Sequence, residues 1–155
     1  MPLLSEHELG LRVDQLRKES KKIGFTCGVF DLIHPGHVRY LRAAKKLCDF
    51  LIVALNDDAS ARRHKGAPLP LVPGLERAEI LADLRWVDAV VMMPDDRPLR
   101  LLELYRPDFY IKGGDYAAGE LKSAKALEEW GGGTQVISVD SDHSSRQLRS
   151  RIRAD

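Results

Sequence analysis

Two histidines around a proline–glycine pair are the residues best suited to chemistry in this sequence. His34 and His37 stand in I-H-P-G-H, shortly after a hydrophobic segment that ends on Asp31. Proline fits the first turn of a helix, so a helix is expected to begin at Pro35. Free N–H groups and the dipole at a helix start attract anions, and two imidazoles on one face add donors. The pattern therefore predicts a phosphate site; the plainer alternative is an HxxH at an ordinary helix cap.

A second group of candidates is cationic. The segment Asp57–Pro73 contains the basic run R-R-H-K, followed by a glycine and several prolines, and a loop that becomes ordered on binding is expected. Lys65 could contact a phosphate or be a solvated surface lysine, and the residues alone leave both open. Arg77 follows the start of a later helix, where a cation opposes the dipole. A bound anion would resolve that conflict, as would a surface ion pair with Glu76 or Glu79.

The end of the first strand could line a nucleotide. Gly28 would let the ligand approach the backbone, because glycine has no side chain. Val29 and Phe30 would add backbone and apolar contacts, or belong to the core. Asp31 is expected to orient polar groups of the substrate or of a loop, with a turn-forming aspartate as its alternative. Gly36 belongs to the same predicted phosphate-binding turn.

Two later polar segments could complete the site. The first, K-G-G-D-Y, consists of Lys112, Gly113, Gly114, Asp115 and Tyr116. Paired glycines allow close backbone approach, while lysine and aspartate could bind phosphate and sugar hydroxyls; an ordinary Gly-Gly turn is the alternative. The second consists of Ser144, Ser145 and Arg146 at the start of the last helix. These residues could hold the β- and γ-phosphates of a nucleotide, although helix capping alone explains one serine.

The hydrophobic pattern predicts strands and helices that alternate along the chain. Strands are expected at 23–30, 50–56, 87–93, 109–111 and 134–139. Helices are expected at 3–20, 35–47, 75–84, 98–105, 120–130 and 144–153. This alternation favours a three-layer, Rossmann-like α/β sandwich around a five-stranded parallel sheet. The expected order 3-2-1-4-5 would bring Gly28–His37 next to Lys112–Tyr116, at the carboxyl ends of the strands.

Composition limits the classes of function. The 155 residues suit a single domain, on which the N-terminal helix of residues 1–20 would pack. A formal net charge of +1 gives no general reason to expect nucleic acid or an anionic membrane as partner. The N-terminus resembles no signal peptide, and no apolar run could span a bilayer, so a cytoplasmic location is expected. Cys27 and Cys48 lack zinc-site spacing and are expected to be reduced core residues; no metal-ligating residues are predicted.

Several segments, taken together and in order, resemble the nucleotidylyltransferase superfamily of cytidylyltransferase-like proteins. They are G-V-F-D-L-I-H-P-G-H-V-R-Y-L, N-D-D-A-S-A-R-R-H-K-G, P-G-L-E-R-A-E-I-L, W-V-D-A-V-V and Y-I-K-G-G-D-Y. Within that superfamily they look most similar to the adenylyltransferase domain that makes ADP-heptose for lipopolysaccharide. The resemblance implies transfer of AMP from ATP to D-glycero-β-D-manno-heptose 1-phosphate, with release of pyrophosphate and a requirement for Mg²⁺. It also implies a homodimer, and it makes His34, His37 and Lys65 the expected catalytic residues.

The resemblance leaves alternatives open. A cytidylyltransferase acting on glycerol 3-phosphate or another small phosphate would use the same machinery with a different base pocket. A nucleotide-binding regulatory module without turnover is the alternative outside enzymes. The chain also departs from its relatives, with Cys27 where an asparagine is usual and Arg146 in place of a hydroxyl residue. These departures leave the base and the acceptor phosphate undecided.

Overall fold

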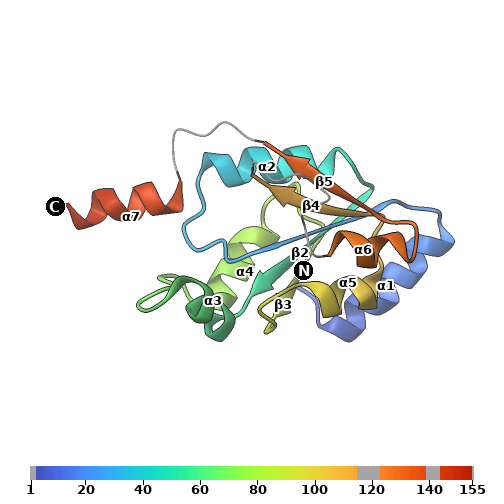
Figure 1. Cartoon of the computed structure of the whole chain (residues 1–155), viewed down its shortest axis with the longest axis horizontal. Coiled ribbons are helices and arrows are strands. Elements are labelled where there is room, and N and C mark those ends of the chain that lie inside the picture. The colour runs from blue at the N-terminus through green and yellow to red at the C-terminus, as the bar shows by residue number, and fades with distance from the viewer. Residues whose placement is uncertain (1–2, 115–122, 139–143, 155) are drawn as a thin grey trace.

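A five-stranded parallel sheet forms the centre of the structure, a computed structural model that describes residues 3–114, 123–138 and 144–154. The strand order is β3-β2-β1-β4-β5 (Figure 1). The strands are β1 (Ile23–Gly28), β2 (Phe50–Asn56), β3 (Ala89–Met93), β4 (Phe109–Gly113) and β5 (Gly133–Ile137). The predicted α/β fold and its strand order are therefore confirmed.

Helices cover both faces of this sheet. They are α1 (Glu6–Lys18), α2 (Pro35–Lys45), α3 (Asp58–Lys65), α4 (Gly74–Ala82), α5 (Leu99–Tyr105), α6 (Ala124–Glu128) and α7 (Ser145–Arg153). One core cluster contains Leu9 of α1 and Leu101 of α5. A second cluster contains Leu41 of α2 and Leu81 of α4. Every residue of β2 is buried, as expected for a strand between two helical layers.

The N-terminal segment is integrated into the fold. Helix α1 buries one face, formed by Leu9, Val13 and Leu16, and this spacing places all three on the same side of a helix. Before the helix, the Leu4 N–H donates to the Val90 carbonyl of β3 at 2.9 Å. This contact covers part of an edge strand that would otherwise expose unpaired backbone groups.

Some predicted boundaries shift. Strand β1 ends at Gly28 rather than Phe30, because Phe30 has a φ of 47°, a left-handed conformation that no strand accommodates. The helix predicted at 120–130 is described only as α6, since residues 115–122 lie outside the described part of the chain. Most other boundaries agree within about two residues, which is the ordinary uncertainty of helix and strand ends.

The prediction of a loop over Asp57–Pro73 is wrong for its first half, which forms helix α3. The Asp57 side chain caps this helix by accepting the Ser60 N–H at 2.7 Å. Ser60 and Ala61 are buried, and the Ser60 hydroxyl accepts from the Asn56 side chain at 2.7 Å. The basic run and the following prolines suggested an irregular segment, whereas the N-cap and these buried small residues favour a helix.

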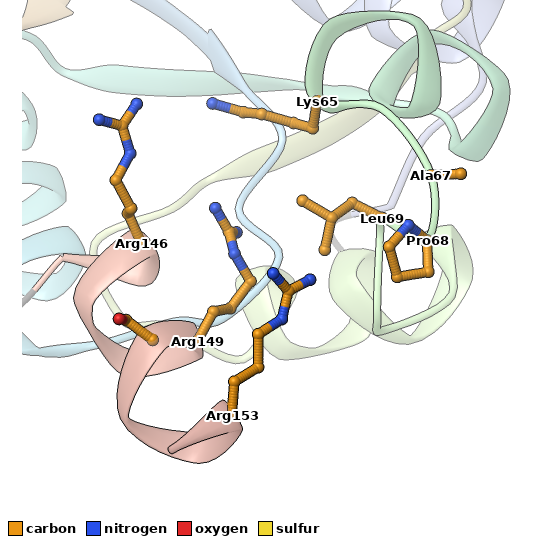
Figure 2. Close-up of a pocket in the computed structure, with 8 residues that line it drawn as sticks. Lys65, Ala67, Pro68, Leu69, Arg146, Arg149 and Arg153 are labelled. Carbon is orange, nitrogen blue, oxygen red and sulfur yellow. The ribbon is translucent and has the colours of Figure 1, made fainter.

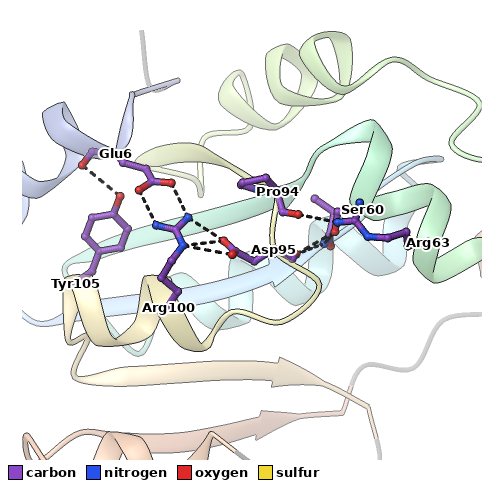
Figure 3. Close-up of polar contacts among 8 residues, drawn as sticks. Glu6, Ser60, Arg63, Pro94, Asp95, Arg100 and Tyr105 are labelled. Atoms are coloured by element: carbon purple, nitrogen blue, oxygen red, sulfur yellow. Dashed lines mark hydrogen bonds and ion pairs between the residues drawn. The ribbon is translucent and has the colours of Figure 1, made fainter.

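A polar network joins α1 to α3 through the turn between β3 and α5 (Figure 3). The Arg100 guanidinium donates to Glu6 of α1 at 2.7 Å and to Asp95 at 2.8 Å. The Asp95 carbonyl accepts from the Ser60 hydroxyl at 3.0 Å, and the Pro94 carbonyl accepts from Arg63 at 2.8 Å. The network therefore holds the helix that carries Lys65 against the body of the molecule.

Of the described helices, none has the length and apolar character needed to cross a membrane.

Candidate functional site

The candidate site lies beyond the carboxyl ends of the strands. Strands β4 and β5 point toward the end of the molecule where α7 lies (Figure 1). Helix α2 begins in the loop after β1, the central strand of the order, and parallel α/β sheets bind their ligands in this region.

His34 and His37 form a tight pair at the start of α2. His34 is the N-cap, and its Nδ1 accepts the Gly36 N–H at 3.1 Å. His37 Nδ1 accepts the His34 N–H at 3.3 Å, and the two ring centroids lie 3.9 Å apart. The Phe30 ring lies against the His37 ring, with centroids 5.3 Å apart. The H-P-G-H sequence thus fixes both imidazoles by capping its own helix.

These hydrogen bonds determine what each imidazole can offer a ligand. In a neutral imidazole one nitrogen accepts and the other carries the proton. Because both Nδ1 atoms accept backbone N–H groups, the hydrogen-bond pattern assigns the proton to Nε2 in both rings. Burial, and then the adjacent His34, lower the pKa of His37 from 6.5 to about 4. His37 is therefore a neutral Nε2–H donor at pH 7 before any anion binds.

Asp31 organises a loop. Its carboxylate accepts the Leu71 N–H at 2.9 Å and the Val72 N–H at 2.9 Å. The residue is 6% exposed. The sequence left open whether Asp31 orients the substrate or a loop, and the structure shows contacts with the segment that joins α3 to α4.

Arg77 lies in the interior rather than at the surface. Its side chain is 0% exposed and donates to three carbonyls, Val72 at 2.9 Å, Val29 at 2.6 Å and Asn56 at 2.9 Å. It also pairs with Asp58 of α3 at 2.7 Å. This corrects the placement of Arg77 among the nucleotide-binding residues. The cation near the start of α4 is neutralised within the protein, by Asp58 rather than by Glu76 or Glu79.

The segment Gly28–Phe30 is closely packed. A Cβ atom on Gly28 would lie 2.9 Å from the Phe30 ring, so glycine is needed here for the fold whether or not a ligand approaches. Phe30 is 7% exposed and belongs to a core cluster. Val29 is half-buried and gives its carbonyl to Arg77. The structure therefore places Phe30 against His37 and in the core, with Gly28 packed on Phe30 and Val29 on Arg77.

Tyr40, which was not predicted as a site residue, links α2 to two strands. Its hydroxyl lies 2.7 Å from the Thr26 hydroxyl of β1 and donates to the Ile111 carbonyl of β4 at 2.9 Å. A Cβ atom on Gly113 would lie 3.1 Å from the Tyr40 ring. The predicted placement of β1 beside β4 is confirmed, and Tyr40 ties α2 to the end of β4. A tyrosine one turn after His37 could have indicated this link.

The K-G-G-D-Y segment is described only in part. Lys112 is half-buried, and its charge counteracts the effect of burial, which raises the pKa of the Cys27 thiol. Gly113 and Gly114 are exposed, and Gly114 has a φ of 125°, which favours glycine. Asp115 and Tyr116 lie outside the described residues.

The start of α7 reaches the same region. Ser144 is the N-cap, and its hydroxyl accepts the Gln147 N–H at 3.1 Å, so the capping alternative accounts for this serine. The Ser145 hydroxyl donates to the Leu32 carbonyl at 3.0 Å. Leu32 precedes His34 by two residues, so two helix starts, α2 and α7, meet at the loop after β1.

A cationic pocket of about 410 Å³ lies between α7 and the segment after α3 (Figure 2). It is lined by Lys65, Ala67, Pro68, Leu69, Arg146, Arg149, Ser150 and Arg153. Lys65 and Arg146, both predicted as site residues, are therefore brought together. Two neighbours of Lys65 in the R-R-H-K run contact the turn after β3 instead. Arg63 pairs with Asp96 at 2.6 Å, and His64 Nε2 lies 2.6 Å from the Asp96 carbonyl.

Comparison with solved structures supports the fold. A lipopolysaccharide core biosynthesis protein from Thermoplasma volcanium superposes with a TM-score of 0.65 at 24% identity, over 79% of this chain and 99% of that one. A pantoate-beta-alanine ligase from Francisella tularensis, crystallised with β-γ ATP and beta-alanine, gives a TM-score of 0.61 at 18% identity, over 94% and 69% of the two chains.

Sequence comparison is more specific. The chain is 42% identical over 151 residues to a protein named bifunctional protein HldE from Bradyrhizobium sp. (strain ORS 278), covering 97% of this chain and 31% of that protein. It is 43% identical over 141 residues to the protein of the same name from Acidiphilium cryptum, covering 91% and 29%. The chain thus spans about a third of the length of these relatives. Residues 25–151 match the family described as Cytidylyltransferase-like, and the chain belongs to this family of nucleotidyltransferases.

Proposed function

We propose that this chain transfers AMP from ATP to D-glycero-β-D-manno-heptose 1-phosphate, which gives ADP-heptose and pyrophosphate. The relatives named bifunctional protein HldE, at 42% identity across almost the whole chain, support this choice within the family. The sequence resemblance to the adenylyltransferase domain that makes ADP-heptose supports the same choice of base and acceptor.

The observation that carries the proposal is the meeting of two helix starts beside the histidine pair. The Ser145 hydroxyl donates to Leu32 at 3.0 Å and brings the start of α7 to the loop that leads into α2. Each helix start offers the positive end of a dipole. At α2 the first backbone N–H groups are used within the H-P-G-H turn, so the donors on that side are the imidazole Nε2–H groups. A triphosphate bound between them would meet donors from both helices, and the acceptor could approach from the Lys112 side.

The chemistry requires positioning and charge stabilisation more than a covalent intermediate. An oxygen of the acceptor phosphate attacks the α-phosphorus in line while the bond to pyrophosphate breaks. His34 and His37 donate through Nε2–H to phosphate oxygens where negative charge develops. The neutral His37 suits this role, since it binds an anion without a buried positive charge in the free protein. Lys65, Gly36, Ser144, Ser145 and Arg146 contribute to nucleotide binding, and Lys112, Gly113, Gly114, Asp115 and Tyr116 to acceptor binding.

Magnesium would bind through the nucleotide. Among the described residues no group of three potential metal ligands occurs, and the Asp31 carboxylate is engaged by two N–H groups. The site thus fits an ion held by triphosphate oxygens and water, as Mg²⁺ commonly is in nucleotide enzymes. When bound, the ion would neutralise phosphate charge.

Two expectations about the whole protein remain part of the proposal. A cytoplasmic location agrees with two free, half-buried cysteines. A homodimer is proposed from the resemblance, and sedimentation analysis at several concentrations would test it. The apolar face of α1 and part of the β3 edge are already engaged within the chain, because α1 buries Leu9, Val13 and Leu16 and the Leu4 N–H donates to Val90.

A pyrophosphate-release assay tests the proposed reaction. ATP and CTP are each combined with heptose 1-phosphate and with glycerol 3-phosphate, and the His37→Ala variant serves as the inactive control. We expect release with ATP and heptose 1-phosphate. A preference for CTP with glycerol 3-phosphate would replace this proposal with the cytidylyltransferase alternative. Nucleotide binding without release for any pair would favour the regulatory module.

A further inference from the structure

Asp31 joins two parts of the candidate site that are distant in the sequence. It lies three residues before His34, in the loop that leads into α2. Its carboxylate accepts the N–H of Leu71 at 2.9 Å and that of Val72 at 2.9 Å. These two residues belong to the segment that begins directly after Lys65, the last residue of α3. One side chain therefore connects the loop that carries the histidines to the segment that follows the lysine.

The segment 66–73 depends on such contacts for its shape. It forms neither helix nor strand and contains three prolines, each of which lacks a backbone N–H. Gly66, Ala67 and Pro68 are exposed, whereas Leu69 is 7% exposed. Burial of one leucine gives this segment little apolar packing, so hydrogen bonds to the body of the protein hold it in place.

Val72 is held at both of its backbone polar groups. Its N–H donates to Asp31, and its carbonyl accepts from the Arg77 Nε at 2.9 Å. Arg77 also donates to the Val29 carbonyl at 2.6 Å, so this second contact leads back to the loop after β1. Both contacts therefore tie Val72 to the loop that leads into α2.

The path from this anchor to Lys65 is short and hydrogen-bonded. The Leu69 N–H donates to the Gly66 carbonyl at 3.0 Å, and the Gly66 N–H donates to the Arg62 carbonyl of α3 at 2.8 Å. Lys65 and Leu69 line the same cationic pocket. A shift of residues 71–72 would therefore move both the pocket wall and the end of α3 that bears the lysine.

A direct contact between Asp31 and the substrate fits the structure less well. The residue is 6% exposed, and both carboxylate oxygens already accept backbone N–H groups. A carboxylate that faced a triphosphate would also repel it. The contacts thus indicate that Asp31 acts on the protein rather than on the ligand.

We infer that Asp31 is a positioning residue for Lys65. It holds segment 66–73 against the loop before α2 and so fixes the lysine relative to the two histidines. A phosphate chain bound by His34 and His37 then meets the Lys65 ammonium without a prior rearrangement of the segment. The inference rests on the proposed function, because it takes Lys65 as a phosphate contact. It adds the residue through which the two parts of the site are coupled.

A double-mutant cycle tests this coupling. Asp31→Asn keeps the size of the side chain but leaves a single, uncharged acceptor oxygen, and Lys65→Ala removes the ammonium. The wild type, both single variants and the double variant are compared by their KM for ATP and their kcat. Asp108→Asn is the matched control, because the Asp108 carboxylate accepts the Ile23 N–H at 2.8 Å at the opposite, amino-terminal end of β1. Circular dichroism verifies that each variant is folded.

We expect Asp31→Asn to raise the KM for ATP about 5- to 10-fold and Lys65→Ala about 10- to 100-fold, as for lost charge-assisted hydrogen bonds. Both should change kcat less than KM. In the Lys65→Ala background, Asp31→Asn should change KM by less than about twofold, because the group that it positions is already absent. Asp108→Asn should stay within about twofold of the wild type.

Equal factors for Asp31→Asn in the two backgrounds would overturn the inference, since a direct or a general structural role does not depend on Lys65. An unchanged KM in either single variant would overturn it too. Hydrogen exchange of the wild type gives a further test that needs no variant. The Leu71 and Val72 amide protons should exchange at least about tenfold more slowly than in an unstructured peptide, and unprotected exchange of both would contradict the role of Asp31.

The outcome is separable from that of the proposed reaction. If the pyrophosphate assay selects CTP with glycerol 3-phosphate, the cycle is repeated with that pair. If no pair reacts, Kd values for ATP and CTP from calorimetry replace KM. Non-additivity in any of these versions supports the role of Asp31 even where the heptose reaction fails. Additivity together with confirmed release from ATP and heptose 1-phosphate leaves the reaction in place and removes the positioning role.

Discussion

The starts of α2 and α7 both face the candidate site, but they are held in different ways. Around α2, the Phe30 ring packs on His37, and the buried Arg77 ties the loop after β1 to β2 and α3. Helix α7 has no buried residue, and one hydroxyl contact, from Ser145 to Leu32, joins its start to that loop. The start of α2 is held by packing and by buried hydrogen bonds. The start of α7 is held by the Ser145 hydroxyl, and the helix exposes its arginines.

This difference suggests a division of labour. Donors that stabilise charge in a transition state must be held in place before the reaction, and the α2 region provides that rigidity. Exposed cations attract and retain a polyanion with less need for a fixed geometry, although salt screens them. Substitutions near α2 should therefore alter folding and kcat, and substitutions on α7 should alter nucleotide affinity.

The largest expected effect belongs to Arg77. Arg77→Met removes a buried guanidinium and leaves three carbonyls and the Asp58 carboxylate without their donor. We expect a loss of about 3 to 5 kcal/mol in the free energy of unfolding, measured by urea denaturation. Arg42→Met, an exposed change on α2, is the control and should cost less than about 0.5 kcal/mol. Equal effects of the two would contradict the bracing role.

Loss of the second histidine should affect catalysis before stability. His37→Ala is expected to reduce kcat about 10²- to 10³-fold, because an Nε2–H donor at the reacting phosphate is removed. Steady-state kinetics at saturating ATP measure this, with the exposed His7→Ala as control. A His37→Ala enzyme with wild-type turnover would contradict the assignment.

The lowered pKa of His37 predicts that the free energy of unfolding decreases in acid. Its pKa is about 4 in the folded protein, against 6.5 ordinarily. As the pH falls from 6.5 toward 4, the imidazole of His37 is protonated in the unfolded chain but stays neutral in the folded protein. The free energy of unfolding therefore decreases in that pH range. Between pH 7 and pH 5, wild type should lose about 1 to 2 kcal/mol more than His37→Gln in denaturant titrations. Identical losses in both proteins would show that His37 is not shifted.

Tyr40→Phe tests the link between α2 and β4. The change removes a hydroxyl that contacts Thr26 and Ile111 at 2.7 and 2.9 Å, and about 1 kcal/mol of stability should be lost. Tyr105→Phe, which removes a longer bond of 3.3 Å to the Glu6 carbonyl, should cost less. Thermal denaturation of the two variants measures both losses of stability. A greater loss for Tyr105→Phe than for Tyr40→Phe would contradict the role of Tyr40 as the link.

The smallest effect is expected on α7. Ile152 is 68% exposed, and Ile152→Ser should change the free energy of unfolding by no more than about 0.5 kcal/mol. A loss of several kcal/mol in the same urea titrations would show that α7 is packed against something in solution, and the contrast with α2 would then fail.

The fold was largely predictable because alternating apolar runs and helical spacing report which faces are buried. The start of α2 at the H-P-G-H turn was equally predictable, since a proline and a capping residue determine a helix start through contacts within one turn. Arg77 was misplaced because its burial depends on carbonyls of Val29 and Asn56, which are distant in the sequence. Helix α3 was missed because the prolines that follow it outweighed the cap at Asp57. The arginines of α7 were visible in the sequence, but only the fold places Arg146, Arg149 and Arg153 around the same pocket as Lys65.

The central claim is that the starts of α2 and α7 together bind a triphosphate beside the histidine pair. A crystal structure with a non-hydrolysable ATP analogue and Mg²⁺ tests this most directly. We expect phosphate density between the two helix starts, with the Nε2 atoms of His34 and His37 within hydrogen-bonding distance of phosphate oxygens. Well-defined analogue bound elsewhere on the protein, with both helix starts free of phosphate, would contradict the claim.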